Sequence, residues 1–222
     1  LETLLCYSSS SFVCYIVRMS NFVLGIAGGS GTGKSTLAFG LADKWPDSTV
    51  VFHLDDYFKP EAMVPKIHGL ANWDSPDALF ADKMIRDLQQ LKNGKPAVIN
   101  TKSPRLNPDF LETGLRIPVE FQPKPLIIVE GFLSLHFEHL RELMDLRIYL
   151  DAPYELHKAR RVHGKLHDFP SNYDDYVLKP MHERYVAPSK QHADKIIDVA
   201  ELKKEQVITE VSELILEKTL IT

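Results

Sequence analysis

Short apolar runs alternate along the chain with segments in which apolar residues recur at helical intervals. A short apolar run bounded by glycine, proline or polar residues predicts a buried strand, and apolar residues spaced three and four apart predict an amphipathic helix. The predicted strands are residues 22–27, 49–54, 126–129, 146–150 and 195–199. The predicted helices are residues 35–45, 75–91, 134–144, 153–163, 173–186 and 201–218.

This alternation predicts an α/β fold in which a five-stranded parallel sheet is flanked by helices on both faces. Residues 98–121 break the pattern, because they are rich in proline and polar residues. Two short apolar runs within them predict a small hairpin insertion. Ser75 and Pro76 supply a hydroxyl N-cap and a proline at the first helical position, which favours a helix start there.

The first residues of the chain differ from the rest. A serine run and a short apolar stretch precede Arg18, whereas a secretory signal has its basic residues before the apolar stretch. Because a strand pattern begins directly after Met19, we expect Met19 to be the natural start and residues 1–18 to be upstream sequence without stable structure. The alternative is a genuine, poorly ordered extension. Residues 19–222 are then expected to form a single domain.

Composition narrows the classes of function. The 222 residues carry a formal net charge of −4, without the basic excess expected of a protein that coats nucleic acid. No apolar run is long enough to cross a membrane. The only cysteines are Cys6 and Cys14, which fits a reducing cytoplasm. Whether the chain forms a homo-oligomer stays open.

The most specific motif is a glycine-rich loop that follows the first strand and opens a helix. Residues 28–35 match GxxxxGK[ST], in the context that confirms a phosphate-binding loop. Glycines let backbone amides approach phosphate oxygens, and the helix N-terminus adds positive potential. Lys34 is expected at the β- and γ-phosphates, and the Ser35 hydroxyl at Mg²⁺. The predicted nucleotide-binding residues are Gly28, Gly29, Ser30, Gly31, Thr32, Gly33, Lys34, Ser35 and Thr36.

The loop is shared by GTPases, motor ATPases and small-molecule kinases. No NKxD run for guanine recognition is present, and 222 residues are few for a mechanical ATPase. A dinucleotide fingerprint does not fit these glycines. A kinase is therefore the favoured class.

Acidic residues follow two of the predicted strands. Asp55 and Asp56 end the second strand, and Glu130 ends the third. Because parallel strands end at one edge of the sheet, these carboxylates are expected beside the loop. There they could orient or deprotonate an attacking hydroxyl, or bind Mg²⁺. The alternative is solvated acids at strand ends.

Two further pairs carry candidate chemistry. Trp73 and Asp74 could stack a flat base and hold ribose hydroxyls, or they could be a core tryptophan and a helix-start acid. Arg160 and Arg161 lie on the predicted helix after the fourth strand. An arginine there could stabilise the transferring phosphoryl group. Adjacent helical residues point in different directions, so at most one of the two is expected to act.

Taken together, these segments resemble the uridine kinase and phosphoribulokinase family of P-loop kinases. The similar segments are in order and cover nearly everything after Met19. They are residues 28–36, 54–61, 72–79, 127–132, 160–161 and 185–197.

The resemblance implies a P-loop NTPase fold with a lid, at about residues 162–172, and the use of ATP with Mg²⁺. It implies Asp55 as the base for the accepting hydroxyl and Glu130 as a partner of Mg²⁺. It also implies Asp74 on the ribose hydroxyls, Trp73 by the base, and Arg161 in the lid near the phosphates. The expected reaction is phosphorylation of the 5′-hydroxyl of a ribonucleoside, uridine or cytidine.

Two departures keep alternatives open. Uridine kinases carry a tyrosine and a histidine in the hairpin that reads the pyrimidine, and residues 100–104 show no such pair. Residues 162–168 also lack the further lid arginines of uridine kinases. The segments at 55–61 and 153–155 resemble nicotinamide riboside kinases as well. A second class is a nucleotide-binding regulator with little turnover.

Overall fold

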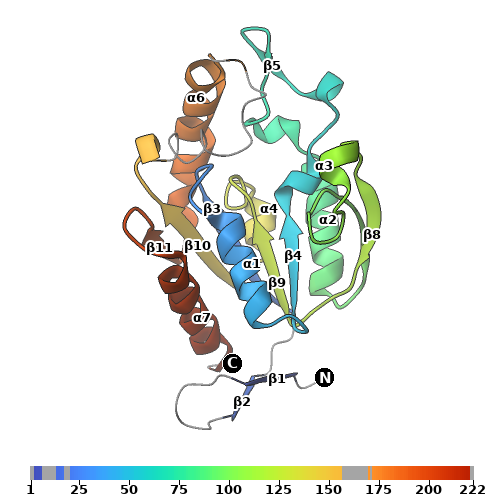
Figure 1. Cartoon of the computed structure of the whole chain (residues 1–222), viewed down its shortest axis with the longest axis vertical. Coiled ribbons are helices and arrows are strands. Elements are labelled where there is room, and N and C mark those ends of the chain that lie inside the picture. Colours follow the sequence, from blue (N-terminus) through green and yellow to red (C-terminus); the bar gives the residue numbers. More distant parts are fainter. Residues whose placement is uncertain (1–2, 7–13, 18–20, 157–169, 171, 221–222) are drawn as a thin grey trace.

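The centre of the molecule is a five-stranded, all-parallel sheet (Figure 1). The computed structural model describes residues 3–6, 14–17, 21–156, 170 and 172–220. The strands lie in the order β11-β10-β3-β9-β4, so that β3 is the middle strand. Their bounds are β3 Phe22–Gly28, β4 Thr49–His53, β9 Leu126–Glu130, β10 Leu146–Asp151 and β11 Lys195–Asp198. The predicted parallel α/β fold is confirmed.

The strand register brings three chain segments to the same level at the carboxyl edge of the sheet. Glu130 on β9 lies opposite Ile26 of β3 on one side and opposite His53 of β4 on the other. Gly28, at the end of β3, lies opposite Leu150 of β10. Because every strand runs the same way, the loops that follow β3, β4 and β9 all begin at one edge.

Helices α1 and α7 cover one face of the sheet (Figure 1). Their bounds are Lys34–Lys44 for α1 and Lys204–Leu220 for α7. The strands present apolar side chains on this face, and both helices bury aliphatic stripes against them. The buried residues include Leu24, Ile26, Ile128 and Ile148 of the sheet, Leu37, Ala38 and Leu41 of α1, and Val207, Val211 and Ile215 of α7.

The opposite face is covered by α2, the short α4 and an antiparallel hairpin. These elements are α2 Ala81–Lys92, α4 Glu138–Arg141, β7 Ala97–Thr101 and β8 Ile117–Phe121. A single helical turn, α3 Phe110–Thr113, lies in the hairpin loop. The hairpin insertion predicted from residues 98–121 is therefore present. Its inner face packs with Met84, Leu88 and Leu91 of α2 in one core.

Two small antiparallel pairs complete the described structure. β5 Lys66–Ile67 and β6 Leu70–Ala71 form a short hairpin at the top of Figure 1. β1 Thr3–Cys6 pairs with β2 Cys14–Val17 within the predicted extension. Among the described residues, no helix combines the length and the apolar character needed to cross a membrane.

The helix predicted over residues 75–91 is wrong in its first turns. Ser75 does cap, since its Oγ accepts a hydrogen bond from the amide of Asp77 at 3.2 Å, but the helix it starts is only the 3₁₀ turn Pro76–Ala78. The backbone is then extended at Leu79, which bridges to Phe58, and α2 begins at Ala81. Tertiary hydrogen bonding to the segment after β4 therefore overrides the local helical pattern.

The helix predicted over residues 134–144 is also too long, because only Glu138–Arg141 is helical. The guanidinium of Arg141 donates hydrogen bonds to the carbonyls of Leu135 and His136, at 2.9 and 2.7 Å. A side chain thus satisfies carbonyl groups that a longer helix would have bonded internally.

The helix predicted at 173–186 is present, and it runs on as helical structure to His192. It contains π-helical turns at Asp174–Leu178 and His182–Val186 on either side of α6 Lys179–Met181, and ends in the 3₁₀ turn Ala187–His192. Pro180 has no amide hydrogen to donate, which favours such irregular turns. The helix predicted at 153–163 and the lid at 162–172 fall almost wholly outside the described residues.

Candidate active site

The loop between β3 and α1 has the backbone that its glycines predict. Gly28, Gly31 and Gly33 all have positive φ, of 143°, 85° and 90°. A Cβ atom at Gly28 would overlap the carbonyl oxygen of Leu150, so this position requires glycine for space as well as for conformation. Gly33 is the residue before α1, which begins at Lys34. The amides of the first helical turn therefore point toward the mouth of the loop.

The charged side chain of the loop lies across the loop itself. The Nζ of Lys34 donates a hydrogen bond to the carbonyl of Gly29 at 2.8 Å, and the Thr32 hydroxyl donates to the same carbonyl at 2.9 Å. The cation is thereby held against the backbone of the loop. This arrangement presents positive charge to a polyphosphate.

Next to the loop, Glu130 joins two strands and the start of α1. Its Oε2 accepts a hydrogen bond from Ser35 Oγ at 3.3 Å, and its Oε1 lies 2.6 Å from His53 Nδ1. Burial lowers the pKa of His53, but the hydrogen bond and the negative charge of Glu130 outweigh it, and the pKa is raised overall. His53 is a site residue that the sequence analysis missed. It could have been found only from the register, which places it opposite Glu130.

The Ser35 and Glu130 oxygens fit a magnesium ion. Both are hard oxygen donors, they lie within hydrogen-bond distance of each other, and they stand beside the phosphate loop. No cluster of three or more acidic, histidine or cysteine side chains is found among the described residues. Mg²⁺ usually takes one or two protein ligands and completes its shell with water and substrate phosphates.

The two acids after β4 have different roles. Both lie in the 3₁₀ turn Leu54–Tyr57. The Asp56 carboxylate is buried and accepts hydrogen bonds from the Thr101 hydroxyl and the Lys102 amide, each at 2.8 Å. Burial raises the pKa of Asp56 in spite of these bonds. Both oxygens of the Asp56 carboxylate are therefore engaged by the hairpin.

Asp55 is the acid that faces the crevice. Its Oδ2 forms an ion pair with Lys102 Nζ at 3.0 Å, and its side chain is 45% exposed. Burial of the carboxyl raises its pKa, but the charges of Lys102, Lys34 and His53 outweigh this, so that the pKa of Asp55 is lowered. Asp55 lies two residues after His53, which contacts Glu130, and Glu130 bonds to Ser35 at the start of α1, so the carboxylate and the phosphate loop lie at the same edge of the sheet. Asp55 is thus ionised at neutral pH, as a proton acceptor must be.

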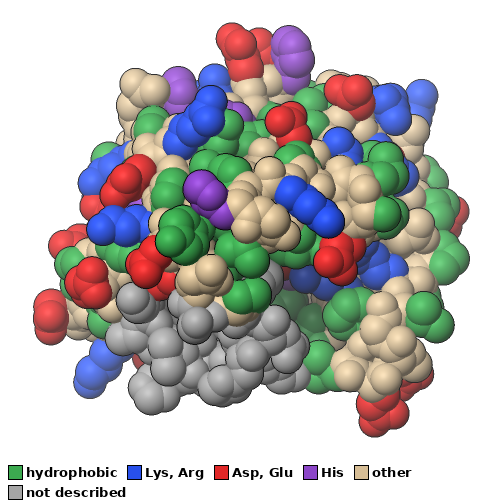
Figure 2. Space-filling model, turned by 90° about the horizontal axis from the view of Figure 1, so that it is seen from above, with side chains coloured by type: hydrophobic (Ala, Val, Ile, Leu, Met, Phe, Trp, Pro, Cys, Tyr) green, Lys and Arg blue, Asp and Glu red, His purple; other side chains and the backbone are tan. Residues whose placement is uncertain are grey.

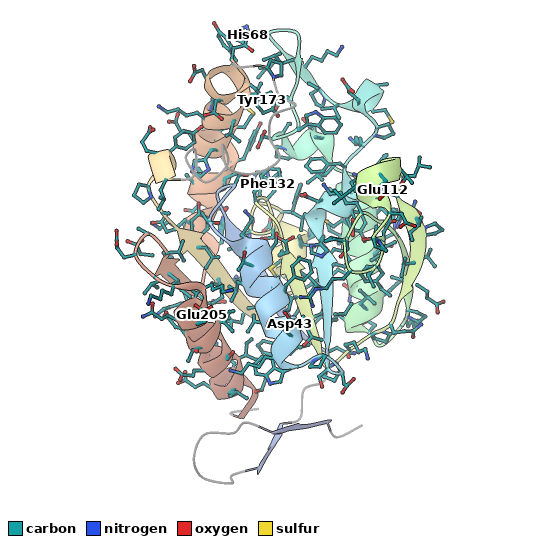
Figure 3. All side chains as sticks on the ribbon, in the orientation of Figure 1. Asp43, His68, Glu112, Phe132, Tyr173 and Glu205 are labelled. Carbon is teal, nitrogen blue, oxygen red and sulfur yellow. The ribbon has the colours of Figure 1, made fainter. Side chains whose placement is uncertain are left out.

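Trp73 and Asp74 are held by Tyr173, the residue that precedes the helical segment beginning at Asp174. The hydroxyl of Tyr173 donates to Asp74 Oδ2 at 2.8 Å and accepts from the Trp73 amide at 3.2 Å. Tyr173 is buried, with 3% of its surface exposed. Figure 3 shows Tyr173 and Phe132 above the sheet, at the end where the phosphate loop lies. Tyr173 is a second residue that the sequence analysis missed.

An aromatic group lies between these two sides. The ring of Phe58 meets the edge of Trp73 at a centroid distance of 5.6 Å and lies nearly parallel to Phe132 at 6.3 Å. These rings come from the loops after β4 and β9 and from the segment before the Ser75 turn. Flat apolar faces of this kind suit a planar ring. Figure 2 shows this end of the molecule hollowed beside the residues drawn in grey, with charged side chains around the hollow.

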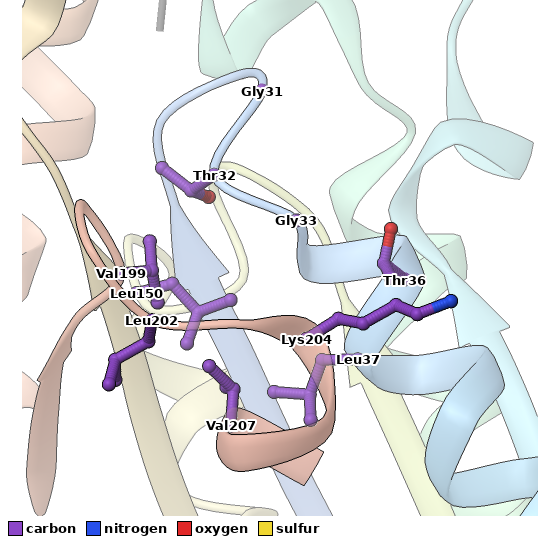
Figure 4. Close-up of a pocket in the computed structure, with 10 residues that line it drawn as sticks. All are labelled: Gly31, Thr32, Gly33, Thr36, Leu37, Leu150, Val199, Leu202, Lys204 and Val207. Atoms are coloured by element: carbon purple, nitrogen blue, oxygen red, sulfur yellow. The ribbon is translucent and has the colours of Figure 1, made fainter. Parts of the chain in front are cut away.

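A pocket lies on the other side of the phosphate loop (Figure 4). Its volume is about 300 Å³, and it is bounded by the loop, the end of β10 and the connection from β11 to α7. Its apolar lining consists of Leu37, Leu150, Val199, Leu202 and Val207. Lys204 also lines it, beside Thr36 in Figure 4.

Arg160 and Arg161 lie outside the described residues, so the structure gives no placement for the predicted lid arginine. Among the other predicted site residues, Ser35 bonds to Glu130, and Asp55 lies two residues after His53, which contacts Glu130. Trp73 packs against Phe58, three residues after Asp55, and Asp74 bonds to Tyr173.

Comparison with known proteins decides the family. The model of the phosphoribulokinase/uridine kinase family matches residues 23–205. The chain belongs to this family. Family membership makes it a kinase that transfers a phosphoryl group to a hydroxyl group, which confirms the expected class of enzyme and the resemblance noted in the sequence.

Several bacterial family members are similar in sequence. A uridine kinase from Staphylococcus epidermidis is 34% identical over 183 residues, which cover 79% of this chain and 86% of that protein. A uridine kinase from Brevibacillus brevis is 33% identical over 191 residues, covering 81% of this chain and 86% of that protein.

Solved structures confirm the fold. A possible uridine kinase from Bacillus stearothermophilus aligns with a TM-score of 0.57 at 21% identity, over 80% of this chain and 88% of that one. Phosphoribulokinase from Rhodobacter spheroides aligns with a TM-score of 0.59 at 11% identity, over 83% of this chain and 74% of that one. The family fold is therefore kept at low sequence identity.

Proposed function

We propose that this kinase transfers the γ-phosphoryl group of ATP to the 5′-hydroxyl of a ribonucleoside, uridine or cytidine. The observation that carries the proposal is geometric: Asp55 follows the strand whose last residue, His53, contacts Glu130, and Glu130 bonds to Ser35 of the phosphate loop. Relatives that are 33–34% identical and named uridine kinases support the choice of acceptor.

In this mechanism, the loop binds the donor. Residues 28–36 surround the phosphates with backbone amides, and Lys34 neutralises charge on the β- and γ-phosphates. The apolar pocket beside the loop offers Leu150, Val199 and Leu202 to the flat base of the nucleotide. A magnesium ion held by Ser35 and Glu130 would supply further neutralisation of the phosphate oxygens.

Asp55 acts on the acceptor. Its carboxylate accepts the proton of the hydroxyl as that oxygen bonds to the γ-phosphorus, and the bond from the γ-phosphorus to the β–γ bridging oxygen breaks, releasing ADP. Asp74 would accept hydrogen bonds from the ribose hydroxyls, with Trp73 and Phe58 beside the base. Arg161 is proposed to approach the phosphates from the lid.

Nicotinamide riboside is the alternative acceptor suggested by the sequence. The segments at 55–61 and 153–155, which resemble nicotinamide riboside kinases, support it, whereas the relatives named uridine kinases support a pyrimidine nucleoside.

The test is ADP release from ATP and Mg²⁺ with uridine, cytidine, nicotinamide riboside, pantothenate, ribulose 5-phosphate or no acceptor. We expect release to rise with uridine or cytidine well above the rate without acceptor. A rise with nicotinamide riboside alone would replace the proposed acceptor. A flat response with nucleotide binding intact would instead support a nucleotide-binding regulator.

A further inference from the structure

The hairpin β7–β8 holds the segment that carries Asp55 from two sides. From the end of β7, the Thr101 hydroxyl and the Lys102 amide donate to Asp56. From the start of β8, the guanidinium of Arg116 donates to the carbonyls of Asp55 and Phe58, at 3.1 and 3.0 Å. Four hydrogen bonds therefore fix the turn after β4 to the hairpin.

Within this clamp, one side chain reaches the proposed base itself. Lys102 Nζ lies 3.0 Å from Asp55 Oδ2 and 5.9 Å from the centre of the Phe58 ring. Its side chain is 31% exposed, so the ion pair is partly removed from water. Among the described residues, nothing donates a hydrogen bond to the other oxygen of Asp55, Oδ1.

When one oxygen of the Asp55 carboxylate is held in an ion pair, the carboxylate rotates less freely about its Cβ–Cγ bond. The other oxygen, Oδ1, then points in a fixed direction. This matters because a proton acceptor is effective only when it is aligned with the hydroxyl from which it takes the proton. The hydrogen bonds of the Asp56 carboxylate and of the Arg116 guanidinium fix where Asp55 lies, whereas the Lys102 ion pair fixes how the Asp55 carboxylate is turned.

We propose that Lys102 is a positioning residue for the phosphoryl transfer. Its ion pair with Oδ2 of Asp55 orients the carboxylate so that Oδ1 accepts the proton of the acceptor hydroxyl. The role rests on the proposed function, since it assumes that Asp55 serves the acceptor.

Other charges also face Asp55 and must be counted. Lys34 approaches from the phosphate loop and His53 from β4, and both lower the pKa of Asp55, as Lys102 does. Asp56, the next residue, carries a carboxyl group of its own. Of the three basic groups, only Lys102 forms an ion pair with the Asp55 carboxylate among the described residues. Removing Lys102 is therefore expected to free the carboxylate while its other neighbours remain.

The test uses Lys102→Met, which keeps the length of the side chain but not its charge, and Lys102→Arg, which keeps the charge. Lys95→Met is the matched control, because Lys95 is an exposed lysine just before β7. Uridine-dependent kcat and the KM for ATP are measured for each. We expect Lys102→Met to lower kcat by about 10- to 100-fold with the KM for ATP unchanged. Lys102→Arg should recover most of the loss, and Lys95→Met should match the wild type.

A second readout does not need turnover. The carboxyl carbon of Asp55 is followed by ¹³C NMR as the pH is lowered, with its signal assigned by its loss in Asp55→Asn. The midpoint should rise by about 1 pH unit in Lys102→Met, because an opposite charge at this distance lowers a carboxyl pKa by at least that much.

The two readouts separate the possible failures. An unchanged Asp55 midpoint in Lys102→Met, or a kcat equal to that of the wild type, would overturn the role of Lys102. Absence of uridine-dependent turnover in the wild type would count against the proposed acceptor instead, and the NMR titration would still decide whether Lys102 controls Asp55.

Discussion

The two sides of the crevice are built differently. On the donor side, the phosphate loop is one continuous segment, and its main groups are backbone amides and the Lys34 and Ser35 side chains that follow them. On the acceptor side, Asp55, Asp74, Lys102 and Tyr173 come from four separate segments joined by side-chain contacts. A site made of backbone binds what all family members share, whereas one made of side chains can change with each substitution.

This contrast predicts that changes on the acceptor side will separate transfer from nucleotide binding. Asp55→Asn should show it most strongly, since the amide keeps the shape of the side chain but cannot accept the proton. We expect kcat to fall by about 10²- to 10⁴-fold. The affinity for ATP, measured by calorimetry, should stay near the wild-type value. Turnover close to wild type would remove Asp55 from the role of base.

On the donor side, Lys34→Met should disturb binding and catalysis together. It removes the cation that lies across the loop, and with it a stabilising contact to the transferring phosphate. A loss of about 10²- to 10³-fold in kcat is expected. Because the loop backbone is retained, residual nucleotide binding should be detectable. A variant whose only defect is a higher KM for the nucleoside would contradict the division into donor and acceptor sides.

Tyr173→Phe tests whether acceptor binding depends on a residue that is distant in the sequence and holds Asp74 in place. The change removes the hydroxyl that donates to Asp74 and accepts from the Trp73 amide. The KM for uridine should rise by about tenfold, which is the cost expected for a lost hydrogen bond to a charged group. The KM for ATP should not move. Equal changes in both KM values would indicate a general loss of packing.

The smallest effect is expected from His53→Gln and concerns stability. The pKa of His53 is raised above its ordinary value of 6.5 by Glu130. The stabilisation from this pair is therefore fully present below pH 6.5 and is lost as the pH rises through the folded pKa. Thermal unfolding without magnesium should show a fall in Tm of a few degrees over this range in the wild type. The fall should be absent in the glutamine variant, and its persistence there would assign the effect to another group.

Local signals predicted the strands well and some helices poorly. Each predicted strand is present, and the central strands β3, β9 and β10 are apolar runs buried along nearly their whole length, which have few other structures open to them. The helices at 75–91 and 134–144 failed where side chains and backbone bonds from elsewhere replaced the helical pattern, as Arg141 does for the carbonyls of Leu135 and His136. The predicted division into an extension, residues 1–18, and one kinase domain, residues 19–222, stays a prediction.

By itself, the sequence determined the parallel sheet, the phosphate loop, and the acids Asp55 and Glu130 at strand ends. These features are contiguous, and their geometry follows from local backbone rules and from the common direction of the strands. Only the tertiary structure decided the side-chain pairs of the site. These pairs are His53 with Glu130, Asp56 with Thr101, Tyr173 with Asp74, and Lys102 with Asp55. Asp74 and Tyr173 are 99 residues apart in the chain, and Lys102 acts on a carboxylate from another supersecondary unit. Such contacts depend on strand order and register, which no local pattern of polar and apolar residues specifies.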